Sequence, residues 1–211
     1  MFSFMKSIDY IVGIDEVGRG PVAGPVSVGA FCVPVKFLKE ILPDDLRESK
    51  KLSKKKREEW FEIFETARKG GKANFVVAST ESKTIDDHGI IFSLKHALSR
   101  AIRELKLNPK VTKVFLDGGL KAPQEFKYQT TIIRGDTKMP VIAAASIVAK
   151  VVRDRRMKKL GEQFPEYGFE CHKGYGTQAH MEAIKTCGLC LEHRKTFLKN
   201  FPRGSTSVNR G

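Results

Sequence analysis

Residues 10–26, YIVGIDEVGRGPVAGPV, combine an apolar run with two adjacent carboxylates, Asp15 and Glu16, and a glycine-flanked arginine. The apolar residues over 9–15 predict a buried strand, because β-branched side chains dominate there and turn-forming residues follow. The Gly/Pro-rich segment predicts a tight loop leading into a second strand over 26–33. An unpaired ionised carboxylate in a low-dielectric site is costly, so acids at a buried strand end require a cation or hydrogen-bond donors.

Two later segments repeat this pattern of a strand followed by an acid and a turn. KVFLDGG, residues 113–119, carries Asp117, and YQTTIIRGD, residues 128–136, ends in Asp136. If these strands neighbour the first one, their carboxylates converge at one edge of the sheet. Hard oxygen ligands of this kind suit Mg²⁺ or Mn²⁺, which also take phosphate oxygens as ligands. Two such cations roughly 4 Å apart are a common arrangement for phosphodiester hydrolysis.

Strand geometry sets a condition on Asp15 and Glu16. Side chains alternate between the two faces of a strand, so these neighbours should point to opposite sides. Both can serve one site if the chain turns directly after them, and Gly18 and Gly20 permit such a turn. Each acid taken singly could equally end a strand and face solvent. Four acids in one repeated pattern, within a basic chain, favour a shared site.

Capping residues and helical periodicity predict the other elements. Ser53 can cap a helix over 54–68, and Thr177 can cap a helix within 177–188. Pro140 opens a long helix through residue 160, since proline is tolerated in the first turn. Strands with intervening helices indicate an α/β protein with a mixed sheet flanked by helices. The remaining predicted elements are a strand over 73–80, a helix over 91–105 and a short helix near 193–200.

The chain has 211 residues, with 38 Lys and Arg against 24 Asp and Glu, and a formal net charge of +14. This excess favours a polyanionic partner, nucleic acid first and an anionic membrane surface second. Two clusters hold many of the basic residues, SKKLSKKKR at 49–57 and RDRRMKK at 153–159. No apolar run approaches the ~20 residues of a spanning helix, and no signal-peptide pattern opens the chain. We therefore expect a cytoplasmic protein outside the membrane.

The CGLC motif at 187–190 has the spacing of a zinc knuckle or a redox pair. The chain has no second CxxC, and Gly188 suits a helix terminator. Reduced thiols are the default for a protein without a secretion signal. A metal or redox role for Cys187 and Cys190 is the less favoured interpretation.

In order along nearly the whole chain, the motifs resemble those of ribonuclease HII, the bacterial type 2 ribonuclease H. They are IVGIDEVGRGPVAGPV, SKKLS, FLDG, RGDTKMPVIAAASIVAKVVRD, HKGYGTQAH and HRKTF. The resemblance implies a ribonuclease H-like fold with a mixed five-stranded sheet and a helical C-terminal extension. It also implies a carboxylate quartet that holds two divalent cations, Mg²⁺ or Mn²⁺. By matching motifs, the quartet is Asp15, Glu16, Asp117 and Asp136.

Asp154 competes with Asp136 for the place of fourth ligand. It lies roughly 20 Å along the predicted helix from Pro140, at 1.5 Å per residue, whereas Asp136 precedes that helix. Lys150 stands four residues before Asp154, which is the spacing of a structural ion pair. We therefore assign the ligand role to Asp136.

The resemblance also implies how a ribonucleotide joined to DNA is recognised. Gly18, Arg19 and Gly20 should contact the ribose 2′-OH and flanking phosphates, because that hydroxyl alone distinguishes the residue chemically from its neighbours. Tyr175 should stack on the sugar of the following deoxynucleotide; a loop tyrosine covering the core is the alternative. Ser49, Lys50 and Ser146 complete the expected substrate-binding set. The alternative for Ser49 and Lys50 is a solvated run of charges, and the alternative for Ser146 is a purely structural role in helix–sheet packing.

The expected activity is endonucleolytic cleavage of RNA in RNA–DNA hybrids, and cleavage 5′ of ribonucleotides embedded in duplex DNA. Two alternatives remain open: a 3′–5′ exonuclease with four acids, and a basic nucleic-acid-binding protein without catalysis. We expect a monomer, and we expect no membrane partner. The predicted organisation is a catalytic domain over 1–165, a helical extension over 166–202 and a mobile tail over 203–211.

Overall fold

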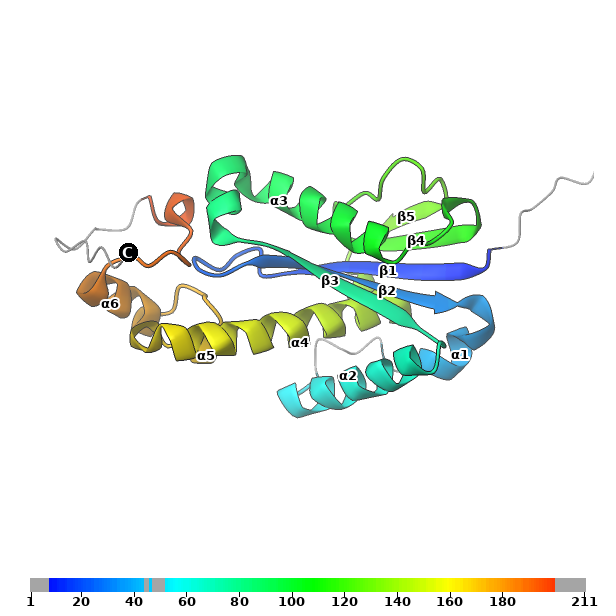
Figure 1. Cartoon of the computed structure of the whole chain (residues 1–211), viewed down its shortest axis with the longest axis horizontal. Coiled ribbons are helices and arrows are strands. Elements are labelled where there is room, and N and C mark those ends of the chain that lie inside the picture. The colour runs from blue at the N-terminus through cyan, green and yellow to red at the C-terminus, as the bar shows by residue number, and fades with distance from the viewer. Residues whose placement is uncertain (1–7, 44–45, 47–51, 200–211) are drawn as a thin grey trace, which may run out of the picture.

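A single mixed sheet forms the centre of the molecule in this computed structural model, which describes residues 8–43, 46 and 52–199 (Figure 1). Its five strands lie in the order β3-β2-β1-β4-β5. β1 pairs antiparallel with β2 and parallel with β4, and β2 pairs antiparallel with β3. The strands are β1 (Tyr10–Val17), β2 (Val26–Pro34), β3 (Asn74–Thr80), β4 (Thr112–Asp117) and β5 (Gln129–Ile132).

Helices cover both faces of this sheet, and Figure 1 shows α3 on one side with α2 and α4 on the other. The longer helices are α2 (Lys54–Lys69), α3 (Ser82–Glu104), α4 (Pro140–Gln163) and α6 (Gln178–Cys187). The short ones are α1 (Leu38–Ile41) and α5 (Phe169–His172). Single 3₁₀ turns are η1 (Val35–Phe37), η3 (Pro109–Val111), η4 (Gly135–Thr137), η5 (Pro165–Tyr167) and η6 (Lys195–Leu198).

Alternation along β1 gives each face its own core. Val12 and Ile14 pack into a cluster with α3, while Ile11 packs on the opposite side with α2 and α4. Burying apolar surface on both faces makes β1 the central strand of the fold. Asp15 and Glu16 lie at the end of this strand, so the core on either side holds their backbone in place.

Helix α4 approaches the sheet unusually closely because glycines face it. A Cβ atom added to Gly13 would lie 2.0 Å from the Val141 carbonyl oxygen, and one added to Gly29 would lie 2.5 Å from that of Ala145. Ala143 and its alanine neighbours on α4 are buried at this contact. The helix backbone therefore rests almost directly on β1 and β2.

The C-terminal segment packs on the far end of α4. Ala23, Met157, Tyr167 and Phe169 are members of one buried cluster, which also contains Ile184 and Leu198. Figure 1 shows α5 and α6 at this end of the molecule, beyond the strands. The predicted domain boundaries stay a prediction, and residues 203–211 lie outside the described residues.

Two buried histidines in this segment form one hydrogen-bonded chain. The Cys190 backbone N–H donates to His193 Nδ1 (3.0 Å), so the proton of a neutral His193 lies on Nε2 and points at His180 Nε2 (3.1 Å). His180 Nδ1 in turn donates to the Tyr175 carbonyl (2.9 Å). Burial lowers the pKa of both histidines to about 4. Both imidazoles are therefore neutral near pH 7.

Local signals predicted several boundaries correctly. Ser53 caps α2, Thr177 caps α6, and Gly188 follows the last residue of α6 with a φ of +79°. Pro140 is the first residue of α4.

Three predicted boundaries were wrong. β1 continues through Val17 without a turn after Asp15, and β5 ends at Ile132 instead of reaching Asp136. α3 begins at Ser82, nine residues earlier than predicted, and contains a kink at Gly89 (φ +82°). Long-range bonds stabilise this early turn, because Ser82 Oγ donates to backbone carbonyls that lie 58 and 110 residues away along the chain.

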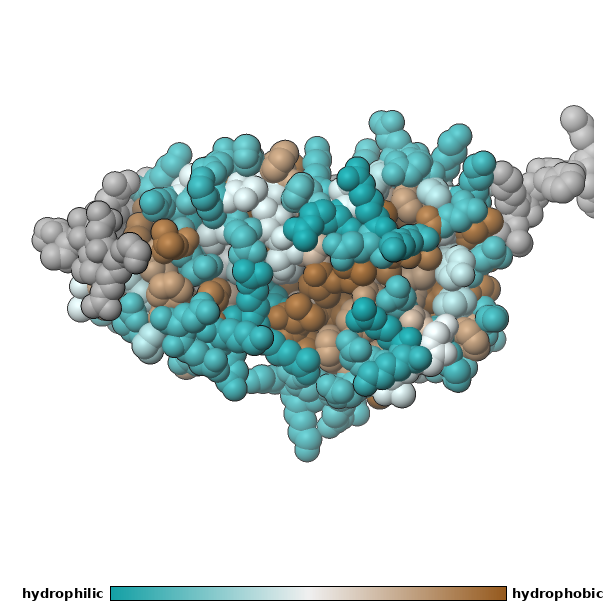
Figure 2. Space-filling view, viewed as in Figure 1, coloured by the Kyte–Doolittle hydropathy of each residue, from teal (hydrophilic) through white to brown (hydrophobic). Residues whose placement is uncertain are grey.

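The face seen in Figure 2 is largely polar, with an apolar strip between the upper and lower helices. None of the described helices combines the length and the apolar character needed to cross a bilayer. The basic cluster at 153–159 is also less exposed than its sequence suggests. Arg153 is buried, Arg155 pairs with Glu58 and Arg156 pairs with Glu81.

Replacing Gly13 by alanine should destabilise the protein, because the new methyl group meets helix backbone that cannot move aside cheaply. Overpacking of this kind typically costs about 1–3 kcal/mol, measured as the free energy of unfolding in urea. Gly119→Ala is the matched control, since no atom lies within 4 Å of its added Cβ. Equal stability of the two variants would contradict the close approach of α4.

The histidine pair should make the folded state sensitive to acid. Because the folded pKa values lie below the ordinary 6.5, the unfolded chain binds more protons between pH 6.5 and 4. Stability is thus fully present above pH 6.5 and falls as the pH drops toward 4, by up to about 1.4 kcal/mol per pH unit for each histidine. Urea denaturation from pH 7 to pH 4.5 measures this slope. His193→Gln should flatten the slope, whereas His96→Gln on the exposed side of α3 should leave it unchanged.

Candidate active site

Asp15 lies on β1 and is buried, with 6% of the residue exposed. It accepts a hydrogen bond from the Glu16 backbone N–H (2.8 Å) and another from the Ser146 side chain on α4. The close packing of α4 on β1 brings Ser146 to this position. The sequence analysis predicted that Ser146 binds substrate. In the structure its side chain instead bonds the carboxylate of Asp15, a predicted catalytic residue.

Glu16 reaches the same strand end from the opposite face, because β1 remains regular through Val17. Its side chain lines a groove beside α3, together with Arg19, Leu94, Lys95 and other residues. One carboxylate oxygen of Glu16 lies 3.6 Å from Arg19 Nη1. The other, Oε2, is buried and has no hydrogen-bond partner among the described residues. The expected turn after Asp15 is absent, yet the strand end still gathers both acids.

Asp117 lies next to both acids at the end of β4. The pairing of Ile14 with Leu116 sets β4 beside β1 one residue before each acid. Burial is the main reason that the pKa values of Asp15 and Glu16 are raised, and the charge of Asp117 adds to the rise for both. Its Oδ1 accepts a hydrogen bond from the Gly135 backbone N–H (2.7 Å).

Asp136 follows Gly135 in the turn η4, four residues beyond the end of β5, and is completely buried. The Asp117–Gly135 bond thus joins its segment to the cluster, and the Cβ position of Gly135 faces the Ile142 side chain of α4. The structure brings Asp15, Glu16 and Asp117 within electrostatic reach of one another. Asp136 is linked to them through its sequence neighbour Gly135, whose backbone N–H bonds the Asp117 side chain. The position of Asp136 relative to β5 is a correction to the predicted strand end.

The electrostatics of this cluster suit a bound cation. Burial, opposed by the Ser146 hydrogen bond and reinforced by the charges of Asp117 and Glu16, raises the pKa of Asp15 to about 8. Burial also raises the pKa of Glu16, with Arg19 acting against it. Crowded carboxylates, including a Glu16 oxygen that no described residue bonds, match the hard oxygen ligands preferred by Mg²⁺ and Mn²⁺. Across the described residues, no three Asp, Glu, His or Cys side chains stand close enough together to enclose a metal ion as they are.

The loop after β1 carries the predicted substrate residues Gly18, Arg19 and Gly20. Gly18 is buried with a φ of +82°, while Arg19 and Gly20 are exposed. A second loop packs against this one, since the Val22 and Ala23 backbone N–H groups both donate to the Gly174 carbonyl (2.9 and 3.2 Å).

Tyr175 follows Gly174 in that second loop, with 46% of its surface exposed. The two loops are thus neighbours, and the exposed ring of Tyr175 agrees better with a contact residue than with a core cover. Ser49 and Lys50 lie outside the described residues.

Two arginines near these loops were not predicted. Arg153 and Arg194 are 1% and 0% exposed, and their guanidinium groups bond backbone carbonyls of the loops. Sequence composition assigned Arg153 to a basic cluster. Both arginines lie in stretches that resemble the family's motifs, VVRD and HRKTF, and this was the one hint in the sequence that they matter. Whether a cation is buried is decided by tertiary packing.

Asp154 forms the predicted ion pair, and α6 ends before Gly188 as predicted. Asp154 accepts from Lys150 (2.7 Å), which confirms the predicted ion pair. The α6 helix ends at Cys187 before Gly188, and all four cysteines are free thiols.

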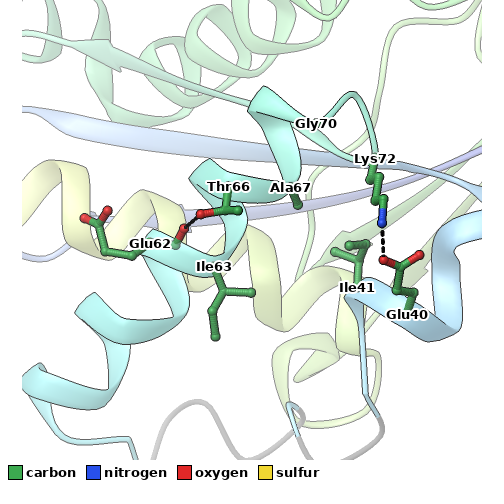
Figure 3. A pocket seen from close by; sticks show the side chains of 8 residues that line it. All are labelled: Glu40, Ile41, Glu62, Ile63, Thr66, Ala67, Gly70 and Lys72. Atoms are coloured by element: carbon green, nitrogen blue, oxygen red, sulfur yellow. Dashed lines mark hydrogen bonds and ion pairs between the residues drawn. The ribbon is translucent and has the colours of Figure 1, made fainter.

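Figure 3 shows another hollow, between α1 and α2. Lys72 and Glu40 close one side of it with an ion pair (2.5 Å), and Thr66 Oγ1 donates to the Glu62 carbonyl. Its other lining residues include Ile41, Ile63 and Ala67. The Glu62 carboxylate of this hollow pairs with Arg155, and Glu40 pairs with Lys72. The hollow therefore lacks the crowded acids that distinguish the end of β1.

Known proteins share both the sequence and the fold. A family model described as Ribonuclease HII matches residues 12–200. The ribonuclease HII of Bacillus cytotoxicus is 47% identical over 193 residues, which cover 91% of this chain and 70% of the relative. The PCNA–ribonuclease HII complex of Archaeoglobus fulgidus aligns with a TM-score of 0.69 at 24% identity, over 94% of this chain and 98% of that chain. Ribonuclease H2 of Pyrococcus horikoshii aligns with a TM-score of 0.65 at 25% identity, over 89% and 93%.

These likenesses confirm the predicted α/β fold, with its mixed five-stranded sheet between helices. The family model spans almost the whole described chain, including the end of β1 and the loops beside it. The Bacillus relative matches the chain over nearly the same extent. The chain belongs to the ribonuclease HII family and is a metal-dependent ribonuclease H, an endonuclease that acts on RNA in RNA–DNA hybrids.

Proposed function

We propose that this enzyme also cuts duplex DNA on the 5′ side of embedded ribonucleotides, and that it hydrolyses the phosphodiester with two divalent cations. The products carry 3′-hydroxyl and 5′-phosphate ends. The observation that supports this most strongly is the buried cluster at the end of β1, where burial and, to a lesser extent, the charge of Asp117 raise the pKa of both Asp15 and Glu16. Such an enzyme would remove misincorporated ribonucleotides and RNA primers during replication and repair.

Asp15, Glu16, Asp117 and Asp136 would hold the cations, Mg²⁺ or Mn²⁺. Bound cations supply an activated water and neutralise the charge that develops on the leaving 3′-oxygen. The protein's own part is to hold the acids in place. Ser146 orients the Asp15 carboxylate, and the Gly135 N–H orients that of Asp117. Burial keeps this charge cluster poorly solvated, which strengthens its attraction for a cation.

The loops beside the acids would recognise the ribonucleotide. Gly18, Arg19 and Gly20 follow Glu16 directly, so groups that bind the sugar or phosphate lie next to the groups that hold the cations. Arg19 is exposed, and its guanidinium can donate to phosphate oxygens. Tyr175, in the loop packed on residues 22–23, would stack on the adjacent sugar. Ser49 and Lys50 remain predicted substrate contacts, and the monomeric state and cytoplasmic location also remain predictions.

Asp15→Asn should abolish catalysis while leaving substrate binding in place. The amide keeps the shape of the side chain but removes the negative charge that a cation needs, so Mg²⁺-dependent cleavage should fall by orders of magnitude. Cleavage of a duplex with one internal ribonucleotide, mapped on a sequencing gel, measures this. A gel-shift titration of the same duplex checks binding.

Asp154→Asn is the matched control, because it removes a carboxylate whose observed partner is Lys150. It should retain near wild-type cleavage. Full activity of Asp15→Asn would discard the assignment of the site, and loss of activity in Asp154→Asn would reopen the choice of fourth ligand. A ladder of products from the strand end would identify an exonuclease instead.

Tyr175→Ala should weaken cleavage of single-ribonucleotide duplexes more than cleavage of continuous hybrids. A duplex with one ribonucleotide offers one productive register, whereas a hybrid offers many, so loss of a stacking contact is less costly there. Stacking of this kind is worth about 1–3 kcal/mol, which corresponds to roughly 5-fold to 150-fold in kcat/KM. The ratio of kcat/KM on the two substrates is the measurement, and Tyr175→Phe should preserve it. An equal loss on both substrates would remove the proposed role.

A further inference from the structure

Arg153 and Arg194 are among the most deeply buried side chains in the molecule, at 1% and 0% exposure. Neither makes a salt bridge with a carboxylate among the described residues. Burial lowers the pKa of both guanidinium groups, and that of Arg194 to about 9. Burying a cation without a counter-ion is costly, so the compensation must come from other bonds.

Arg194 places all of its observed hydrogen bonds on one loop. Its Nε donates to the Gly24 carbonyl (2.9 Å), Nη1 to that of Arg19 (3.1 Å) and Nη2 to that of Gly18 (2.7 Å). The planar guanidinium thus spans the loop from residue 18 to residue 24. The backbone carbonyls of Gly18, Arg19 and Gly24 are thereby fixed in orientation, because all three point toward one buried guanidinium.

Because the peptide bond is planar, the direction of these carbonyls also fixes the direction of the N–H groups that follow them. In a trans peptide, the N–H of one residue points opposite to the C=O of the residue before it. Because the Gly18 and Arg19 carbonyls point inward at Arg194, the N–H groups of Arg19 and Gly20 point outward. Arg19 and Gly20 are the exposed residues of the loop. The outward side is therefore lined with hydrogen-bond donors.

Arg153 joins this loop to the Tyr175 loop. Its Nε donates to the Pro25 carbonyl (2.9 Å), and its Nη2 donates to the Lys173 carbonyl (3.1 Å). The guanidinium also fills the space beside Gly18, where an added Cβ would lie 2.1 Å from Arg153 Nε. The two arginines lie close enough that the charge of Arg153 lowers the pKa of Arg194.

We propose that Arg194, supported by Arg153, is a positioning residue that sets the specificity of this enzyme for a ribonucleotide within DNA. The inference rests on the proposed function, because it concerns the loop that would read the ribose. Arg194 aims the Arg19 and Gly20 N–H groups at the sugar hydroxyl and flanking phosphate oxygens. It does so before substrate arrives, so less ordering is left to the binding step.

The test separates recognition from chemistry by using the Asp15→Asn enzyme, which leaves the ribonucleotide uncut. Fluorescence anisotropy gives the Kd for a duplex with one ribonucleotide and for the all-DNA duplex of the same sequence. The ratio of these Kd values measures discrimination for the 2′-OH. Arg194→Met should reduce the ratio by about tenfold, the effect expected when one or two hydrogen bonds are lost. Arg194→Lys, which keeps a buried donor, should restore part of it.

Two controls separate positioning from general damage. Arg156→Met removes the same charge from an exposed ion pair with Glu81, and Phe64→Leu weakens the core next to α2. Both variants should preserve the ratio of the two Kd values. Thermal denaturation should show that Phe64→Leu is destabilised about as much as the Arg194 variants. If Arg194→Met does not fold, Arg194→Lys alone should show a reduced ratio.

An unchanged ratio in a folded Arg194 variant would overturn the inference while leaving the proposed function intact. The proposed function fails separately if the wild-type enzyme does not cleave the single-ribonucleotide duplex. A reduced ratio in both controls would also overturn the inference, since it would trace the loss to stability or charge and not to the loop.

Discussion

The contact of α4 with the bare backbone of Gly13 and Gly29 is the constraint on which the functional end of the molecule depends. Without side chains between them, helix and sheet approach closely enough for Ser146 to bond Asp15. The same helix packs against the Gly135 turn, whose N–H orients Asp117. One steric condition in the core therefore sets the positions of groups that belong to four separate elements, β1, β4, η4 and α4.

The end of β1 carries buried charge of both signs. On one side, desolvation by burial and the crowding of like charges raise the pKa of Asp15 and Glu16, and a bound divalent cation would relieve both effects. A few residues further on, Arg153 and Arg194 are buried beneath the loop that follows. Each charge is costly to bury and would gain from a bound partner or from fixed dipoles. Divalent cations that accompany a nucleic acid can neutralise the buried acids, while the backbone carbonyls of the loops accept hydrogen bonds from the buried arginines.

Local chemistry explains which boundaries could be predicted. Ser53, Thr177, Pro140 and Gly188 act on the backbone within three or four residues, so the helix ends they mark were identified correctly. The start of α3 was missed because Ser82 bonds partners that are distant in the chain. The turn at Gly135 was missed for a similar reason, since its N–H bonds Asp117, 18 residues earlier.

The amino-acid sequence alone determined the fold class and the strand that ends in Asp15 and Glu16, because hydrophobic periodicity and motif order are properties of the chain itself. The assignment of Asp15, Glu16, Asp117 and Asp136 to one site rests on the resemblance of the motifs and stays a prediction. Tertiary structure decided which face each acid occupies, since the strand stays regular where a turn was expected. It also decided that two arginines leave the basic surface for the interior. Burial and long-range hydrogen bonds exist only once segments far apart in the chain have packed together, and no local pattern encodes them.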